Sequence, residues 1–112
     1  MNHKDLDVWK SGTLLTESVY TETANFPKYE PFGITSRLRR AAGSVSANIA
    51  KGFVRHRDKG NREFKQFLSI SSGSRAKLET LSILSNKIEV LNDSNRDDLL
   101  QFVTQSSNYS TV

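Results

Sequence analysis

The sequence predicts an all-α protein, an antiparallel four-helix bundle with up-down-up-down topology. Apolar residues recur at helical spacing in four separate segments, and no segment alternates apolar and polar residues as a strand does. A proline-containing linker, a basic stretch and a tight polar turn separate the four segments. Because 112 residues make one domain at most, we assign residues 1–112 to a single bundle.

The first two helices are expected at residues 6–24 and 34–53. Pro27 ends the first, because a proline disfavours helical geometry in the residue before it. In the second, the apolar side chains fall within an arc of about 80°, and Gly52 suits the C-terminal cap. These apolar side chains are Ile34, Leu38, Ala41, Val45 and Ile49. The other residues of this helix are mostly small, so a neighbouring helix can approach it closely.

The third helix, the longest, is expected at residues 61–92, after a basic loop over residues 54–60. Apolar and small residues repeat there every seven positions over about four heptads, which is typical of helices that supercoil gently around partners. A polar stretch then breaks the pattern. The fourth helix is expected at residues 95–108, with Ser94 and Asp97 as an imperfect capping box.

The residue types exclude most catalytic chemistry. The chain has no cysteine, which excludes disulfides, thiolate-bound zinc, iron–sulfur clusters and a cysteine nucleophile. His3 and His56 have no companion ligands at metal-binding spacing, and neither a phosphate-binding glycine loop nor a serine nucleophile elbow is present. We therefore expect no enzyme activity, no catalytic residue, no metal and no cofactor. With neither a signal peptide nor an apolar membrane span in the sequence, the expected location is the cytoplasm, without a membrane partner.

Charge is distributed unevenly along the chain. The formal net charge is +4. Residues 37–65 hold nine Lys or Arg and two Asp or Glu, a net +7, so the remaining residues carry −3. The protein is therefore predicted to present one basic surface.

Four of these cations share one side of the second helix. At 100° per residue, Arg37, Arg40, Lys51 and Arg55 line one flank beside the buried face, which we call the basic flank. Arg57, Lys59 and Arg62 are expected to extend it. Such a row can neutralise the phosphates of RNA or DNA. The alternative is that these side chains are solvated or pair with acids of a neighbouring helix or subunit.

Two polar residues are expected at helix contacts. Asn48 lies at the edge of the apolar stripe of the second helix, and Glu79 lies on the third helix, which should pack nearby. We predict that they pair at a helix–helix or subunit contact, where they fix register rather than catalyse a reaction.

A series of short motifs carries a family resemblance. The motifs are LDVWK at residues 6–10, FPK at 26–28, GITSRLRRAA at 33–42, SVSANIAKGF at 44–53, EF at 63–64, FL at 67–68, GS at 73–74 and LET at 78–80. Over about residues 5–92 the chain resembles the four-helix-bundle family of 23S rRNA intervening sequence proteins, formerly labelled ribosomal proteins. Residues 33–53 are the specific part. The chain departs from the family at Lys51, where Glu is usual, and at Ser46 and Ala47, where Pro-Ser is common.

The resemblance implies a small bacterial bundle without known catalytic activity, typically a ring-like homopentamer. Such proteins are encoded in inserts within large-subunit rRNA genes or elsewhere in bacterial genomes. A related branch, the accessory proteins of diversity-generating retroelements, has basic surfaces that bind a reverse transcriptase and nucleic acid. The expected function is a non-enzymatic, self-associating module that binds RNA, DNA or a nucleic-acid-associated protein through its basic flank. The alternative is a purely structural protein–protein interaction module, such as a reverse-transcriptase accessory subunit, whose basic residues form subunit contacts.

Overall fold

The fold consists of four α-helices. The computed structural model describes residues 3–27, 33–59 and 61–110, and within these ranges it does not describe the side chains of 3–6, 8, 55–59, 61 and 105–110. The helices are α1 (His3–Thr23), α2 (Ile34–Lys59), α3 (Asn61–Lys87) and α4 (Asp93–Ser110). No strand occurs within these ranges, and the predicted all-α four-helix bundle is confirmed.

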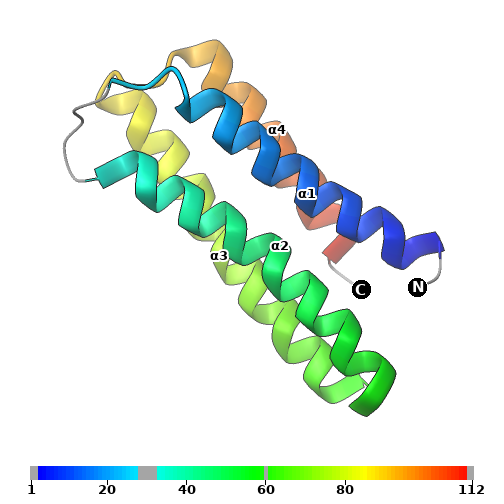
Figure 1. The fold of residues 1–112 in the computed structure, drawn as a ribbon. Helices are drawn as coiled ribbons and strands as arrows, with labels where there is room; N and C mark the ends of the chain where they lie inside the picture. The colour runs from blue at the N-terminus through cyan, green and yellow to red at the C-terminus, as the bar shows by residue number, and fades with distance from the viewer. Residues whose placement is uncertain (1–2, 28–32, 60, 111–112) are drawn as a thin grey trace.

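The helices are arranged as two antiparallel pairs. α1 lies beside α4, and α2 lies beside α3 (Figure 1). Each helix also contacts one helix of the other pair, α1 with α2 and α3 with α4, which is the arrangement of an up-down-up-down bundle. The α2–α3 pair is the longer one, and the two pairs diverge toward the end that carries both termini (Figure 1).

The core lies along the axis between the four helices. Its fully buried side chains come from α1, α2, α3 and α4 at the helical spacing that the sequence predicts. They include Leu15, Val19, Ile34, Leu38, Val45, Ile49, Leu78 and Leu99. After α1 ends, Phe26 is buried against this cluster and so anchors the start of the linker.

Serine and threonine hydroxyls bridge the close helix contacts. Between α1 and α2, the hydroxyls of Thr16 and Ser46 lie 2.6 Å apart, and Ser46 Oγ donates to the carbonyl of Gly12 at 2.8 Å. Between α2 and α3, Ser71 Oγ donates to the carbonyl of Val45 at 3.1 Å. The small residues of α2 therefore allow close contacts with both α1 and α3, as their size predicts.

Gly52 has a different role from the predicted helix cap. It lies inside α2 and is buried. A Cβ at this position would lie 3.3 Å from Phe67 Cβ and 3.4 Å from Phe64 Cδ2 of α3, closer than most van der Waals contacts. The glycine therefore permits close approach of two helices, and α2 continues past it.

The predicted basic loop over residues 54–60 is wrong, because α2 continues through Lys59. Arginine and lysine favour helical conformation almost as well as leucine, so an uninterrupted helix is the local preference of this stretch. The apolar periodicity that marks residues 34–53 is weak there, which is why the sequence pattern placed the helix end too early. α2 and α3 are thereby separated by residue 60 alone.

α3 ends at Lys87, five residues before the predicted end. Glu89 has a positive φ of 66°, and the amide of Val90 donates to the carbonyl of Ser85 while that of Glu89 donates to Asn86, each at 3.0 Å. This is the Schellman pattern, in which glycine is the usual residue at the left-handed position. The apolar spacing continues beyond the turn, since Leu91 is buried, and it therefore gave no sign of the helix end.

The remaining helix ends differ by a few residues from prediction. α1 begins at His3 and ends at Thr23, against an expected 6–24. α4 covers Asp93–Ser110 against an expected 95–108, and Asn92 caps it instead of Ser94. The amide of Asn95 donates to Asn92 Oδ1 at 2.8 Å, which satisfies one of the free amides at the helix start. None of the described helices is both long and apolar enough to cross a membrane.

Candidate nucleic-acid interface

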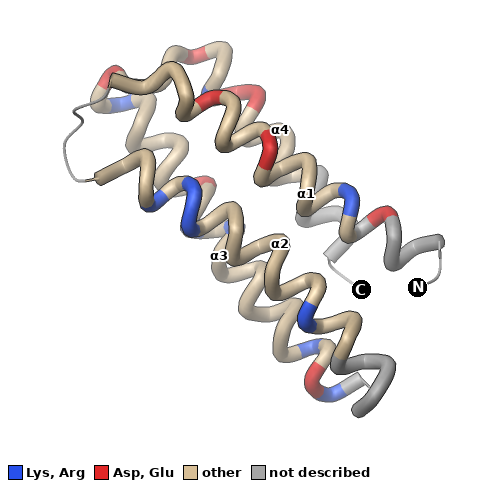
Figure 2. Tube along the Cα trace, in the orientation of Figure 1, with Lys and Arg blue, Asp and Glu red and all other residues tan. Residues whose placement is uncertain are grey.

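Charge is segregated between the two helix pairs. α2 and α3 contain twelve Lys or Arg and three Asp or Glu, a net +9, whereas α1 and α4 contain three Lys or Arg and seven Asp or Glu, a net −4. Figure 2 shows the cations concentrated on α2 and α3 and the acids on α1 and α4. Because each pair forms one side of the bundle, the linear charge imbalance of the sequence becomes a difference between two sides of the molecule.

Three members of the basic flank are solvent-exposed on α2. Arg37, Arg40 and Lys51 are all exposed, and none forms an ion pair with an acid in the described part of the chain. Arg40 Nη2 donates a hydrogen bond to Ser36 Oγ at 3.2 Å, and this bond is itself exposed to solvent. In a single copy of the chain, the positive charges of these three side chains are therefore available to an external anion.

The middle of the basic flank lies at the contact with α3. Ser44 falls between Arg40 and Lys51 on the same side of α2, and its Oγ lies 2.8 Å from Ser74 Oγ of α3. Lys77 follows Ser74 by one helical turn and is exposed. Because α3 runs antiparallel to α2, this turn places Lys77 level with Arg40. The structure thus adds Lys77 to the candidate interface, and no signal within one helix could have identified it.

Two other cations of α2 and α3 are used inside the bundle. Arg39 Nε donates to Thr23 Oγ1 at 2.9 Å, and its guanidinium lies 4.7 Å from the ring centre of Tyr20, so Arg39 joins α2 to α1. Arg75 is only 5% exposed, and its Nη1 has no hydrogen-bond partner. Burial lowers the pKa of Arg75.

The other predicted members of the interface lie where α2 ends and α3 begins. Arg55, Arg57 and Lys59 belong to the last turns of α2, and their side chains are outside the described residues. Arg62 is exposed in the first turn of α3. The helical geometry places Arg55 one turn after Lys51 on the same side of α2.

Asn48 and Glu79 do not pair within one chain. The Nδ2 of Asn48 donates to the carbonyl and to the Oγ of Ser44, at 2.7 and 3.1 Å, so the NH2 group of Asn48 has its partners within α2. Glu79 is exposed on α3, close to the level of Leu38 when the contact between Ser44 and Ser74 sets the register. The predicted helix–helix pair within the chain is therefore wrong, and a subunit contact between the two residues stays a prediction.

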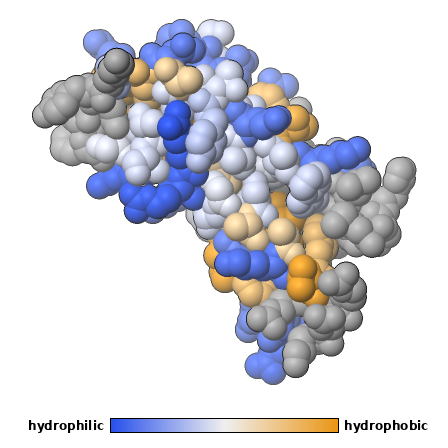
Figure 3. All heavy atoms as spheres, viewed as in Figure 1, coloured by the Kyte–Doolittle hydropathy of each residue, from blue (hydrophilic) through white to orange (hydrophobic). Residues whose placement is uncertain are grey.

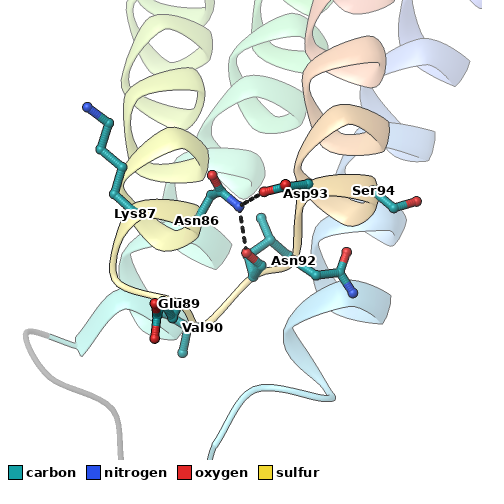
Figure 4. A pocket seen from close by; sticks show the side chains of 8 residues that line it. Asn86, Lys87, Glu89, Val90, Asn92, Asp93 and Ser94 are labelled. Atoms are coloured by element: carbon teal, nitrogen blue, oxygen red, sulfur yellow. Dashed lines mark hydrogen bonds between the residues drawn. The ribbon is translucent and has the colours of Figure 1, made fainter.

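A surface hollow lies at the turn between α3 and α4 (Figure 4). Asn86 holds this turn together: its Nδ2 donates to the carbonyl of Leu91 and to Asp93 Oδ1, and its Oδ1 accepts from Arg96 Nη1 at 2.7 Å. Arg96 also pairs with Asp97 at 3.0 Å. The hollow is lined by Asn86, Lys87, Glu89, Val90, Leu91, Asn92, Asp93 and Ser94. Asn86, Asn92 and Asp93 of this lining form hydrogen bonds that hold the turn, so we assign these three side chains a structural role.

Among the described side chains, no group of three or more His, Cys, Asp or Glu is placed to hold a metal ion.

The exposed surface also contains apolar side chains next to the cations. Val54 of α2 is 50% exposed and Ile70 of α3 is 51% exposed. In the space-filling view, apolar patches interrupt the hydrophilic surface on the lower half of the molecule (Figure 3).

Comparison with known proteins assigns the fold to a family. The family model described as 23S rRNA-intervening sequence protein matches residues 4–110. The chain belongs to this family. Among solved structures, this family member is similar to a protein of unknown function from the S23 ribosomal protein family of Bacteroides thetaiotaomicron. The two chains are 16% identical with a TM-score of 0.65, and the match covers 96% of this chain and 91% of the other. No curated protein matches the sequence.

Proposed function

We propose that this member of the 23S rRNA-intervening sequence protein family is a self-associating module that binds RNA or DNA through the basic flank and catalyses no reaction of its own. The observation that best supports binding is that Arg37, Arg40 and Lys51 are exposed on one side of α2 without an acid partner in the described part of the chain. A row of unpaired cations attracts a polyanion, because each phosphate that it neutralises releases counterions. Seven of the ten acids in the four helices lie on the opposite helix pair, so they offset this attraction only weakly.

Self-association is supported by exposed apolar side chains on several helices. Trp9 and Leu14 of α1 are 41% and 50% exposed, and Ile83 and Leu84 of α3 are 38% and 39% exposed. A small domain that leaves large apolar side chains in water gains free energy by covering them with another copy. We propose an oligomer of about five subunits in the cytoplasm, which is what the family resemblance implies. Light scattering at tens of micromolar tests this, and a monomer at that concentration contradicts it.

Salt dependence tests the binding proposal. We expect the wild type to bind a nucleic acid at about 50 mM salt and to lose affinity steeply as salt is raised. Arg40→Gln with Lys51→Gln should weaken binding and lower the log–log salt slope by roughly one unit for each phosphate contact removed. The matched control is Lys10→Gln with Lys87→Gln, which removes two exposed cations from other sides of the molecule. Fluorescence anisotropy measures both, and absence of binding by the wild type contradicts the proposal.

The second candidate function is a purely structural module in which the basic flank forms subunit contacts. The exposed Val54 and Ile70 beside the cations favour it, since protein interfaces combine an apolar centre with a charged rim. The same double variant separates the two functions. If it keeps the oligomer and loses nucleic acid, the cations bind phosphate. If it dissolves the oligomer, the cations belong to the subunit contact.

A further inference from the structure

We propose that the basic flank selects double-stranded over single-stranded nucleic acid, by contacting the two backbones of a duplex with two separate groups of cations. The inference rests on the proposed nucleic-acid binding and names its substrate class. The first group consists of Arg37, Arg40 and Lys77. The second group consists of Lys51 and of Arg55, which follows it by one helical turn on the same side of α2.

The two groups are separated by an uncharged stretch. Lys51 follows Arg40 by eleven residues, which at 1.5 Å per residue is about 16 Å along α2. Ser44 and Ala47 occupy the same side of the helix between them, and both are small and uncharged. On α3, the level of Ser44 is taken by Ser74, which is hydrogen-bonded to it. Charge along this surface is therefore divided into two points instead of forming a continuous row.

The spacing matches the two backbones of a duplex. The major groove of B-form DNA is about 12 Å wide between its backbones, so the phosphate rows on its two sides lie roughly 16–18 Å apart when the size of the phosphate groups is counted. The wide minor groove of A-form RNA also separates two phosphate rows. Each cation group can then meet one row, while the uncharged middle faces the groove. A single strand along α2 would carry one phosphate per nucleotide without interruption and would place some of them over the uncharged middle.

The described aromatic side chains offer no stacking surface at this site. Proteins that bind single strands stack bases on exposed aromatic rings. The exposed aromatic side chains, Trp9 and Tyr20, belong to α1, and the guanidinium of Arg39 covers the ring of Tyr20. Phe53 and Phe64, at the α2–α3 contact, are partly buried and pack on each other with ring centres 5.3 Å apart. Binding at the basic flank is thus left to phosphate contacts, which favour a partner of fixed shape.

The test compares a labelled 20-base-pair duplex with each of its two separated strands, using the full chain and fluorescence anisotropy at about 50 mM salt. We expect the duplex to bind at least about tenfold more tightly than either strand. Equal or tighter binding of the single strands overturns the duplex inference while leaving nucleic-acid binding intact. Binding of neither probe overturns the proposed function and this inference together.

A second variant tests the uncharged middle. Ala47→Lys places a cation between the two groups, and we expect it to narrow the preference for the duplex several-fold, because a single strand then meets a continuous row. The control is Ala76→Lys, which adds the same charge at an exposed position on another side of α3 and should leave the ratio of the two affinities unchanged. Equal changes in that ratio for both variants overturn the two-group arrangement. Circular dichroism of both variants shows that the helices are retained.

Discussion

Ser44 Oγ and Ser74 Oγ lie 2.8 Å apart and join α2 to α3 midway between the two groups of cations. Asn48 Nδ2 donates to the same Ser44 hydroxyl at 3.1 Å. The three side chains form a small polar network at one level of the two longest helices and so mark their register. The position of Lys77 opposite Arg40 follows from this register.

The Ser44–Ser74 contact should be measurable as a coupling energy. We expect Ser74→Ala to lower the free energy of unfolding by about 0.5–1.5 kcal/mol, and Ser44→Ala to lower it by at least as much because Asn48 loses a partner too. The double variant should cost less than the sum of the two, since neither hydroxyl is then left without its partner. Urea unfolding of the four proteins measures the coupling. Strict additivity would show that the two hydroxyls do not interact in solution.

Gly52 should tolerate a larger side chain much less well than Gly43. Gly52→Leu forces apart α2 and α3 where a Cβ already meets Phe67 at 3.3 Å, and we expect a loss of about 1–3 kcal/mol in the free energy of unfolding. A Cβ at Gly43, in the same helix, would meet no atom of another helix within 4 Å. Gly43→Leu is therefore expected to be neutral or stabilising, because leucine favours helix more than glycine. Thermal unfolding of both variants is the measurement, and equal effects would argue against a specific close approach at Gly52.

Arg75 should be replaceable by an apolar side chain of similar length. Its guanidinium is buried, and its Nη2 donates to Ser72 Oγ at 2.7 Å. Because Nη1 lacks a partner, we expect Arg75→Met to raise the free energy of unfolding by about 1–2 kcal/mol. Arg37→Met, at an exposed position, should stay within about 0.5 kcal/mol of wild type. A clear loss of stability in Arg75→Met, followed in urea, would mean that the charge has a partner in solution.

Stability should depend on pH through Glu22. Desolvation, and then the charge of Asp98 on α4, raise the pKa of Glu22 above its ordinary value of 4.5. The carboxyl of Glu22 therefore holds its proton more tightly in the folded state than in the unfolded chain. At neutral pH the ionised Glu22 destabilises the fold. This cost in free energy disappears as the pH falls through the folded pKa and below 4.5.

We expect Glu22→Gln to raise the melting temperature at pH 7 and to lose this advantage at about pH 3. In an Asp98→Asn background the gain at pH 7 should be smaller, because the like charge is gone. A gain that persists unchanged to pH 3 would come from a source other than titration. Thermal unfolding across this pH range distinguishes the two cases.

The sequence predicts the four helices well because each buries one face, and burial repeats with the period of the helix. Two boundaries escape this signal for opposite reasons. Residues 54–59 continue α2 without a strong apolar pattern, so the helix end predicted from periodicity comes too early. At Glu89 the chain turns through a left-handed residue that is not glycine, while Leu91 keeps the apolar spacing. The end of α3 predicted from periodicity therefore comes too late.

The sequence likewise predicts some features of the candidate site and not others. Exposure of Arg37, Arg40 and Lys51 could be predicted, because it depends only on their angles around one helix. The position of Lys77 and the internal partner of Asn48 could not, since both depend on the register of α2 against α3. Register is set by hydroxyl contacts between small residues, and such contacts leave no periodic pattern in the sequence.

The separation of charge between the two helix pairs gives the molecule a permanent electric dipole across its narrow dimensions of 22 and 18 Å. A polyanion exerts a torque on such a dipole, so the protein turns its α2–α3 side forward before contact is made. Under the proposed nucleic-acid binding, the acids of α1 and α4 influence the rate of encounter although they lie outside the binding surface. We expect that neutralising these acids changes the association rate constant and its salt dependence, while the dissociation rate constant keeps its value.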